Sequence, residues 1–425
     1  MNTSNTAPAP NSEPPPSGET AKLVPLIRKI IRELEPELIE FRRDLHAHPE
    51  PAYKEHRTTA KVIERLTKAG LDPRPLEGTG LICDIGVAQP YAGVGTFGNA
   101  GRPVRDTITA VRADIDALPL PDLCGQPWHS VTDGWAHGCG HDAHTTVVLG
   151  TGLALAELQK RGYPVPPTRL IFQPAEEVLP GGAHEVLAQH GLAGVRRIVA
   201  LHCEPKLEVG KIATRVGPIT SATDEVTVHL ISEGGHTSRP HLTGDIVFAL
   251  GEVITQVPSI LGRRLDPRSG VNLTWGMVRA GDAHNAIPAE GMVAGTLRCL
   301  DIRAWEQAGA LLDQAITQVV APYAVDVTLR HMRGVPPVEN DPAVTGQLIE
   351  AARAVVHREN VEITEQSLGG EDFAWYLTRV PGAMVRLGTQ ALGAKQGDLH
   401  QGDLNIDEAA IAIGARLFTT FVMTC

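Results

Sequence analysis

The sequence predicts an α/β fold that is interrupted by a smaller domain of a different type. Apolar strand-like runs alternate with helical patterns over residues 80–201, as they do in α/β sheets. Over residues 222–334 the predicted order is β-α-β-β-α-β, the split order of a ferredoxin-like domain. The α/β pattern then resumes. We therefore expect one α/β domain made of residues 21–221 and 335–425, with the ferredoxin-like domain inserted between the two parts.

Each expected element follows from the spacing of apolar residues and from the turn residues that bound it. Apolar side chains three to four positions apart predict a first helix, which Pro49 and Pro51 stop. In the α/β part we expect helices at 22–48, 58–68, 342–357 and 405–422 and strands at 80–86, 106–113, 168–172, 195–201 and 382–388. In the inserted part we expect strands at 224–231, 271–278, 291–300 and 324–331 and helices at 245–261 and 302–320.

Length and composition limit the function classes. The chain has 425 residues, 42% of them hydrophobic, which is enough for two or three domains with a sizeable core. Its net charge of -11 disfavours nucleic acid and anionic membranes as partners, and no apolar run approaches a membrane span. Six thinly spread cysteines indicate a reducing, cytoplasmic location. Residues 1–20 are rich in Pro and Ser without a secretory pattern, so we expect a disordered tail.

The segment Trp-Ala-His-Gly-Cys-Gly-His-Asp-Ala-His at residues 135–144 is the first candidate for a functional site. Glycines on both sides of Cys139 allow a tight turn into the next helix, and a thiolate with imidazoles is ligand chemistry for a divalent metal such as zinc. The alternative is a buried cysteine among scattered surface histidines. His46 and His48, at the exit of the first helix, could also touch a metal, but imidazoles near a helix end more often act as caps.

Polar side chains of metal-ligand type follow three successive predicted strands. Asp114 and Asp116 follow the strand at 106–113, Glu176 and Glu177 follow the strand at 168–172, and His202 follows the strand at 195–201. Because open α/β sheets bind ligands at the carboxyl ends of their strands, we expect these side chains at one edge. The alternative for the two aspartates is that they cap the next turn.

The two adjacent glutamates need a backbone turn if both are to face one point. Pro174, just after the strand, makes that turn plausible. Paired carboxylates behind a buried strand are costly to shield without a counter-charge, and a metal ion supplies one. One glutamate can then ligate while its neighbour accepts a proton from water.

Eight motifs carry a resemblance to a known family. They are RRDLHAHPE (42–50), RADIDALP (112–119), HGCGHDAHTT (137–146), FQPAEE (172–177), LHCEP (201–205), GGHTSRPH (234–241), AHNAIP (283–288) and GGEDFAWY (369–376). In this order they resemble the amidohydrolase branch of the aminoacylase and carboxypeptidase-like co-catalytic metallopeptidases, which includes hippurate hydrolases, N-acyl-amino-acid amidohydrolases and auxin-conjugate hydrolases. The resemblance covers residues 22–425. It implies a mixed-sheet α/β dinuclear-metal hydrolase domain whose inserted domain, residues 222–334, serves as a lid and dimerisation domain.

The resemblance also implies roles for individual residues. The implied ligands of two divalent metal ions are Cys139, His141, Glu177, His202 and His400. Glu176 resembles the general base of the family, and Asp116 resembles the acid that orients a ligand. His400 is followed by Gln-Gly-Asp-Leu instead of the usual His-Asn/Ser-Pro-x-Phe pattern, so the packing behind it differs, and Asp403 could compete as a local acid.

Three residues of the inserted domain match lid positions that hold the carboxylate or the oxyanion of the substrate, namely His236, Asn285 and Arg298. Relatives form dimers from lid to lid, which implies a homodimer in which His236 serves the site of the neighbouring subunit. The mixed thiolate, imidazole and carboxylate set suits zinc first, while manganese, cobalt or nickel would also fit.

The implied activity is metal-dependent hydrolysis of the amide bond of N-acyl amino acids, with a metal-bound hydroxide as nucleophile and Glu176 as general base. A dipeptidase or carboxypeptidase on the same site is the alternative among enzymes. A non-catalytic metal-dependent binder is another class, although the Glu176/Glu177 pair argues against it, because a binder needs no proton shuttle. A zinc deaminase fits less well, since no Cys-x-x-Cys accompanies the Cys-x-His.

Overall fold

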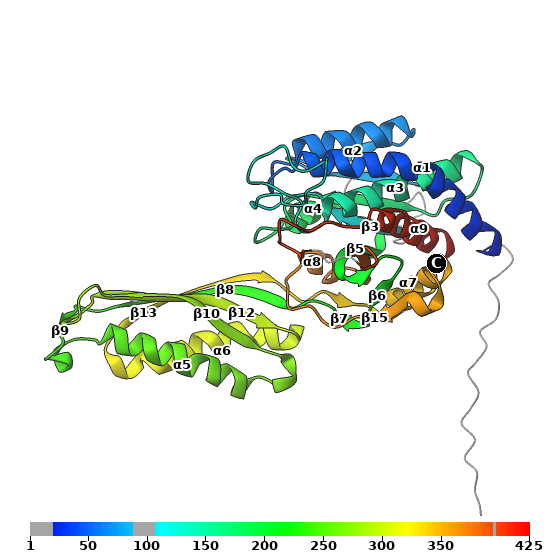
Figure 1. Cartoon of the computed structure of the whole chain (residues 1–425). Coiled ribbons are helices and arrows are strands. Elements are labelled where there is room, and N and C mark those ends of the chain that lie inside the picture. The colour runs from blue at the N-terminus through cyan, green and yellow to red at the C-terminus, as the bar shows by residue number, and fades with distance from the viewer. Residues whose placement is uncertain (1–19, 88–106, 394–396) are drawn as a thin grey trace, which may run out of the picture.

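The computed structural model describes residues 20–87, 107–393 and 397–425. In this part of the chain a larger body of helices around a sheet carries a long, narrow extension on one side (Figure 1). The expected tail at residues 1–20 lies outside the described residues except for Thr20, where the first helix begins.

The sheet of the larger body has eight strands in the described ranges, in the order β1-β2-β4-β3-β5-β16-β6-β15. The strands are β1 (Pro73–Pro75), β2 (Leu81–Ile85), β3 (Ile108–Asp114), β4 (Thr168–Gln173), β5 (Val195–Glu208), β6 (Ile212–Thr214), β15 (Val361–Ile363) and β16 (Gly382–Gln390). Strands β3, β4, β5 and β16 run parallel, whereas β2 pairs antiparallel with β4 and β6 with β16. This confirms the mixed α/β sheet.

Helices cover both faces of this sheet, and the central strands are therefore apolar on both faces. In β3, Val111 packs into the core under the long helices, while Ala110 packs into the core on the opposite face. The long helices are α1 (Thr20–Ala47), α2 (His56–Lys68), α3 (His141–Lys160), α7 (Pro342–Val355) and α9 (Ala409–Thr424). The short helices α4 (Ala183–Ala188) and α8 (Ala374–Leu377) contribute to the opposite core.

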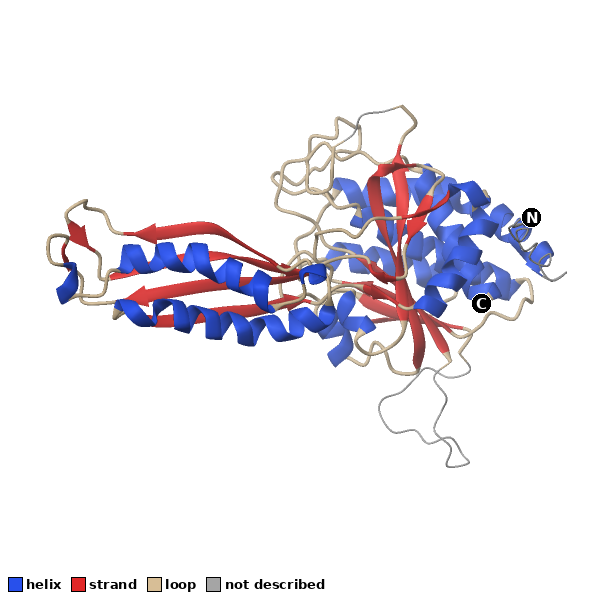
Figure 2. Cartoon of the chain, turned by 90° about the horizontal axis from the view of Figure 1, so that it is seen from below, coloured by secondary structure: helices blue, strands red, loops and turns tan. Residues whose placement is uncertain are grey.

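The extension follows the predicted β-α-β-β-α-β order. Its elements are β8 (Ala222–Ile231), α5 (Ile246–Arg264), β10 (Asn272–Ala280), β12 (Glu290–Cys299), α6 (Ile302–Val320) and β13 (Asp326–Val335). The antiparallel sheet has the order β10-β12-β8-β13, and both helices pack on one of its faces (Figure 2). At its far end β9 (Gly235–His236) pairs with β11 (Ala286–Ile287).

Helix α5 is long and apolar enough to cross a membrane by length and composition, the single such helix in the described ranges. One such helix is weak evidence for a span, because core helices pass the same test. Its buried side chains, such as Leu250, Val253 and Val257, pack against the sheet and α6 in the core of the extension. Core packing therefore accounts for its composition.

Several boundaries differ from those predicted by sequence. Strand β5 continues through His202 to Glu208, so that histidine lies inside the strand and not after it. The last helix begins at Ala409, and the Asp407 carboxylate just before it accepts the Ala409 backbone N–H at 2.9 Å. Residues 405–408 therefore precede the helix instead of forming its first turn. The expected strand at 106–113 begins at Ile108, and residue 106 lies outside the described residues.

Candidate metal centre

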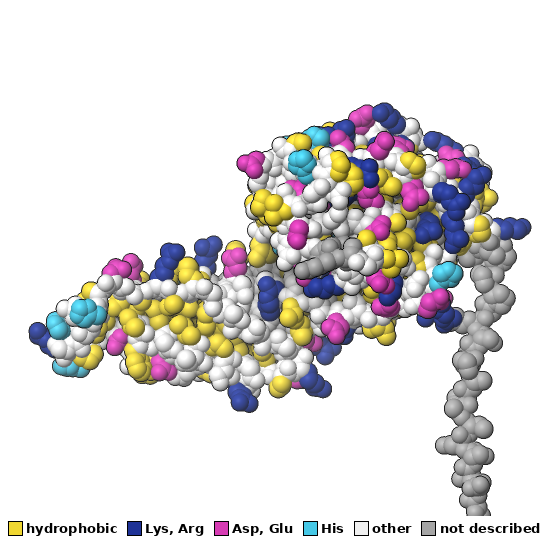
Figure 3. Space-filling model, in the orientation of Figure 1, with side chains coloured by type: hydrophobic (Ala, Val, Ile, Leu, Met, Phe, Trp, Pro, Cys, Tyr) yellow, Lys and Arg dark blue, Asp and Glu magenta, His cyan; other side chains and the backbone are white. Residues whose placement is uncertain are grey.

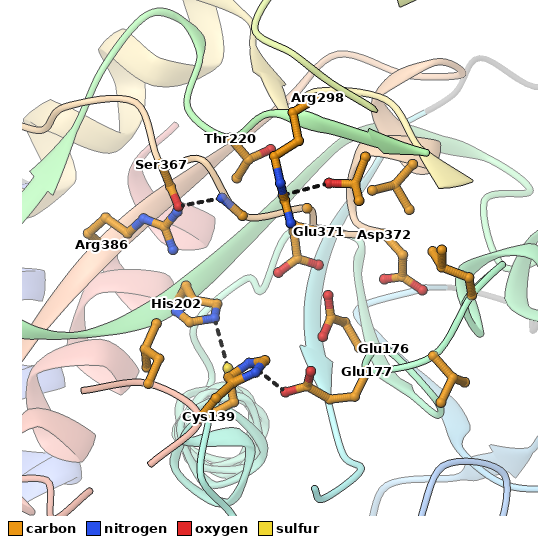
Figure 4. A pocket seen from close by; sticks show the side chains of 18 residues that line it. Cys139, Glu176, Glu177, His202, Thr220, Arg298, Ser367, Glu371, Asp372 and Arg386 are labelled. Atoms are coloured by element: carbon orange, nitrogen blue, oxygen red, sulfur yellow. Dashed lines mark hydrogen bonds and ion pairs between the residues drawn. The ribbon is translucent and has the colours of Figure 1, made fainter. Parts of the chain in front are cut away.

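Four of the five predicted metal ligands, Cys139, Glu177, His202 and His400, line a cavity of about 390 Å³ between the larger body and the base of the extension. The fifth, His141, lies beside them, with its Nε2 atom 3.7 Å from Glu177 Oε1. Figure 4 shows Cys139, His202, Glu176 and Glu177 on one side of this cavity and Arg298 on the other. The turn after β4, strand β5, the loop before α3 and strand β12 of the extension thus contribute to one space, whereas Asp114 and Asp116, at and after the end of β3, do not line it.

A tight turn places Cys139 at the wall of this cavity and His141 beside it. Gly140 precedes helix α3 with φ 82°, and a Cβ atom there would lie 3.0 Å from the sulfur of Cys203. Only glycine adopts this conformation at so close an approach without strain. Cys139 and His141 therefore project from the two sides of a turn that no larger residue could make.

The histidine rings are oriented by acceptors at their Nδ1 atoms. His141 Nδ1 lies 3.0 Å from the carbonyl oxygen of Asp116 and 3.2 Å from its Oδ1, so Nδ1 carries a proton and donates it. His202 Nδ1 donates to the carbonyl oxygen of Cys203 at 2.7 Å. In both rings Nε2 is the nitrogen left to hold a cation, which is the arrangement that metal-binding histidines require.

Several buried atoms at this point lack the partners that burial demands. Among the described residues His141 Nε2 and Glu177 Oε1 have no hydrogen-bond partner, although they lie 3.7 Å apart. His202 Nε2 lies 3.4 Å from Cys139 Sγ, and His400 Nε2 lies 3.4 Å from Glu177 Oε1. Buried nitrogen and oxygen atoms that face one another without hydrogen-bond partners, and that can ligate a metal, indicate a site for a cation.

These donors fit a pair of divalent cations. Ligand atoms of Cys139, His141 and His202 lie within 4.8 Å of one another, and so do those of Cys139, Glu177 and His400. Cys139 belongs to both groups, so one sulfur could serve two cations. Burial, with Glu177 and Glu176 nearby, raises the pKa of the Cys139 thiol well above its usual range. A thiolate at this position therefore needs positive charge beside it.

The two imidazoles differ in charge before any cation binds. Burial opposes a charge on His141, but the carboxylates of Asp114 and Asp116 outweigh this effect and raise its pKa to about 10. Burial, together with the nearby Arg386 guanidinium, lowers the pKa of His202 well below its usual range. His202 is thus neutral and ready to ligate, whereas a cation must displace a proton from His141.

A strained turn directs both glutamates into the cavity. Ala175 has φ 53°, which is rare for a residue with a Cβ atom, and it follows the Pro174 that suggested a turn. The carboxylate of Glu55 accepts the Ala175 N–H at 2.8 Å, and Asp116 Oδ2 accepts the Glu177 N–H at 2.9 Å. Two buried carboxylates therefore hold the turn that separates Glu176 from strand β4.

The Glu176 carboxyl is largely buried and lies near other carboxylates. Burial raises the pKa of this carboxyl well above the usual range, and the negative charges of Glu371 and Glu177 raise it further. The direction of this shift favours the protonated form of the group. Positive charge at the neighbouring donors would lower its pKa and make it a proton acceptor.

A second network, which the sequence did not reveal, lies behind this cluster. The buried Arg112 donates to Asp114 Oδ2 at 2.6 Å and to Asp372 Oδ1 at 2.8 Å, and its NH2 group lies 3.2 Å from Glu371 Oε1. Asp114 also accepts from His144 Nδ1 at 2.6 Å. Asp114 therefore holds Arg112 and His144 and lies 3.8 Å from His141 Nε2, while Asp116 contacts His141 Nδ1 and the backbone N–H of Glu177.

Two predicted substrate-binding residues lie elsewhere. His236 and Asn285 are exposed in and beside the β9–β11 pair at the far end of the extension, and neither lines the cavity (Figure 1). The His236 ring contacts Ser238 of its own loop at 2.9 Å. Arg298 does line the cavity, where its NH1 group donates to Thr223 Oγ1 and to the Leu368 carbonyl oxygen. Within one chain the structure therefore brings Arg298 to the site but not the other two.

Other candidates from the sequence have local partners. His46 contacts Asp142 and Asp122, and His48 Nδ1 lies 2.8 Å from the Asp44 carbonyl oxygen at the end of α1, which is the capping role expected there. Asp403 does not line the cavity.

Three cavity residues escaped the sequence analysis, namely Glu371, Asp372 and Arg386. The first two belong to the GGEDFAWY motif, which was noticed without a role. Arg386 stands in the predicted apolar strand Gly-Ala-Met-Val-Arg-Leu-Gly, and a lone arginine in a buried strand was a signal that could have been used.

This mixed α/β sheet, with thiol, imidazole and carboxylate donors gathered at one cavity, defines a metal-dependent hydrolase. The model of peptidase family M20/M25/M40 matches residues 110–424, and the chain belongs to this family. The family assignment agrees with the resemblance inferred from the eight motifs.

Three relatives illustrate the match. A protein of Rhodococcus jostii (strain RHA1) named as glutamate–cysteine ligase 2-3 is 48% identical over 386 residues, 90% of this chain but 46% of that protein. The chain thus spans about half of that relative's length, and the name applies to the longer protein. The N-acetyl-L-cysteine deacetylase of Bacillus subtilis (strain 168) is 33% identical, over 89% of this chain and 85% of its own. The crystal structure of Bacillus subtilis YXEP, described as a dinuclear metal binding peptidase from the M20 family, has a TM-score of 0.76 with 28% identity, covering 92% and 98% of the two chains.

Proposed function

We propose that this protein hydrolyses the amide bond of N-acyl amino acids with the help of two divalent metal ions. The observation that carries the proposal is a buried carboxylate, Glu176, beside donor atoms that face one another without partners. The deacetylase name of one relative and the dinuclear description of another support the substrate class and the metal number. The ligands in this proposal are Cys139, His141, Glu177, His202 and His400.

The chemistry divides between the cations and the side chains of the chain. Divalent cations, when bound, supply Lewis acidity toward the amide carbonyl and make water more acidic. Glu176 accepts a proton from the attacking water and returns it to the leaving nitrogen, as a general base that becomes a general acid. The Asp116 carboxylate accepts hydrogen bonds from His141 Nδ1 and from the backbone N–H of Glu177. It therefore fixes the positions of two proposed ligands.

Arg298 is the side chain that we assign to the carboxylate of the amino acid. Its NH1 group is engaged by Thr223 and Leu368, which fixes the guanidinium while its other nitrogens remain available. A guanidinium binds a carboxylate through two parallel hydrogen bonds. The variant Arg298→Ala should therefore lose the preference for N-acyl amino acids over simple amides.

We also propose a homodimer in which each extension acts as a lid and contributes His236 and Asn285 to the neighbouring site. Both residues are exposed at the far end of the extension, too remote to serve their own cavity. Figure 3 shows apolar side chains exposed along the extension, and Met277 and Val278 on the edge strand β10 are among the exposed residues. An open sheet edge with apolar side chains is a surface that pairing with a second copy would cover.

Zinc is our first choice of metal, because a thiolate, imidazoles and a carboxylate form the ligand set; manganese, cobalt or nickel would also fit. All six cysteines are free, which supports the proposal of a reducing, cytoplasmic location.

The test is a panel of N-acetyl, benzoyl and long-chain acyl amino acids, assayed with each metal beside unblocked dipeptides and peptides. We expect hydrolysis of the acylated amino acids and little of the unblocked dipeptides. The opposite preference would favour the dipeptidase or carboxypeptidase alternative. Metal-dependent binding of these compounds without any hydrolysis would favour a binder.

A further inference from the structure

Arg386 is a buried cation without an acceptor. Only 6% of its surface is exposed, and it lines the cavity of the metal centre. In the described ranges no carboxylate or carbonyl oxygen lies within hydrogen-bond or ion-pair distance of its guanidinium. Burial lowers the pKa of this guanidinium, which reflects the cost of holding an unpaired charge away from water. Such a group is normally paired.

The position of Arg386 is fixed by the sheet. It lies on β16 directly opposite His202 on the parallel strand β5, so both side chains leave the same face toward the cavity. Figure 4 shows the guanidinium on the side of the cavity away from Glu176. Glu204, Glu371 and Cys139 raise the pKa of this guanidinium by charge alone, and among the described residues none of them forms an ion pair with it. Glu371 instead lies 3.2 Å from Arg112.

The same wall offers further hydrogen-bond donors. Ser367 Oγ accepts the Gly369 N–H at 3.1 Å, and Thr220 Oγ1 accepts the Val338 N–H at 2.8 Å. Each hydroxyl oxygen thus accepts one hydrogen bond from the backbone, and its own proton remains free to be donated. Both residues line the cavity, so each proton can be donated to a bound molecule there. A guanidinium with hydroxyl donors is a recognition site for a carboxylate.

Two guanidinium groups therefore face one cavity of about 390 Å³, Arg298 from the extension and Arg386 from the larger body. Arg298 has two protein acceptors, whereas Arg386 has none among the residues that the structure describes. A substrate with one carboxylate would satisfy Arg298 and leave Arg386 buried and unpaired.

We propose that Arg386 binds a second carboxylate, so that the preferred substrates are N-acyl amino acids with two carboxylates. This inference rests on the proposed function for the reaction but specifies its substrate class. The second carboxylate belongs either to the side chain of the amino acid or to the acyl group. Both sources present the same anion to Arg386, and the experiment separates them.

The experiment measures binding to the full-length metal-loaded Glu176→Gln variant, which should hold substrates without turning them over. Calorimetry compares N-acetylglutamate with N-acetylglutamine and N-succinylalanine with its neutral succinamoyl analogue. We expect the acidic member of at least one pair to bind roughly tenfold to hundredfold more tightly. Adding Arg386→Met should reduce that ratio to about one, and Arg386→Lys should leave an intermediate ratio, because lysine keeps the charge but not the fork. Arg263→Met, at an exposed position on α5, is the matched control and should keep the ratio.

Equal affinities within both pairs would overturn the inference, and so would a preference for acidic compounds that survives Arg386→Met. Hydrolysis by the wild-type protein is measured on the same compounds. If the acidic compounds bind through Arg386 but none is hydrolysed, the proposed function fails while the inference stands. If all are hydrolysed with equal kcat/KM and bind equally, the proposed function stands and the inference fails.

Discussion

Glu176 owes its chemistry to its surroundings. The side chain is buried among other carboxylates, so its proton affinity depends on whether positive charge occupies the neighbouring donors. In the proposed mechanism this property makes Glu176 a proton carrier whose pKa depends on metal binding. The same side chain in water would titrate in the acid range and would accept a proton from water too weakly.

The variant Glu176→Gln tests this role, because it keeps the shape of the side chain but cannot accept a proton. We expect kcat to fall by a factor on the order of 10² to 10⁴, with the metal content unchanged by elemental analysis. Glu233→Gln, an exposed position in the extension, should behave as wild type. Turnover near the wild-type rate in Glu176→Gln would exclude it as the general base.

Cys139 belongs to both groups of candidate ligands, so its loss should affect both cations. In Cys139→Ser we expect metal occupancy to fall below one ion per chain after dialysis, because a neutral hydroxyl is a far weaker ligand than a thiolate. Elemental analysis measures the occupancy, and Cys425→Ser, at an exposed cysteine, controls for the loss of a thiol. Full occupancy in Cys139→Ser would contradict its assignment as a ligand.

Residue types and motifs were sufficient to predict most of this site, but two kinds of information were missing. Pro174 correctly indicated the turn that separates Glu176 from its strand, because backbone restriction is local. Arg386 was missed because the strand around it is otherwise apolar, and its lack of a partner is a property of the folded neighbourhood. The positions of His236 and Asn285 relative to the cavity depend on the length of the extension, which no local pattern encodes.

At the scale of elements, a buried charge cluster joins α1 to α3. Asp142, in the first turn of α3, lies 2.7 Å from both Arg42 Nε and His46 Nδ1, which come from α1. Burial and the Arg42 charge oppose protonation of His46, but the hydrogen bonds that its ring donates to the carboxylates of Asp122 and Asp142 outweigh them and raise its pKa to about 10 from 6.5. The helix that begins with His141 is thus anchored one residue beyond a candidate ligand.

This cluster should make stability depend on pH in the alkaline range. Since the pKa of His46 is higher in the folded state, its contribution is complete below about pH 6.5 and is lost as the pH rises toward 10. We expect His46→Gln to lower the free energy of unfolding by about 3 kcal/mol at pH 6 and by much less at pH 9.5. Urea unfolding at several pH values measures the difference.

His48→Gln serves as the control, because that ring contacts a backbone carbonyl at the end of the same helix. A His46→Gln effect that is constant from pH 6 to 9.5 would show that the ring contributes packing and not charge.

The ends of helices and strands are the features that the pattern of apolar residues predicts least well. The predicted strand at 195–201 stopped at the first polar residues, whereas β5 extends to Glu208 because its backbone pairs with β16 across that stretch. Residues 405–408 are predicted to form the acidic first turn of the last helix, whereas α9 begins at Ala409. In both cases hydrogen bonds decide the boundary, and side-chain hydrophobicity does not report them.

At the scale of the whole molecule, the proposed homodimer predicts complementation between two inactive variants. Glu176→Gln should inactivate the site in its own chain, and His236→Ala should inactivate the site of its neighbour. A hybrid dimer of the two contains one complete site. Co-expression with two different tags should therefore restore about a quarter of the wild-type activity, since half of the dimers are hybrids with one working site of two.

Purified hybrids should show this activity, whereas each variant alone should remain inactive. Hybrids without activity, or a monomeric protein by analytical ultracentrifugation, would contradict the shared site. A His236→Ala variant that stays fully active would do the same.

The two arginines of the cavity belong to different units of the molecule. Arg298 is carried by β12 of the extension, and Arg386 by β16 of the central sheet. Strands β8 and β13, which lead into and out of the extension, lie paired beside each other, so any rotation about them changes the spacing between the two guanidinium groups. A substrate with two carboxylates, bound by both guanidinium groups, would fix the distance between them. The angle between the extension and the larger body would then depend on the length of the bound substrate.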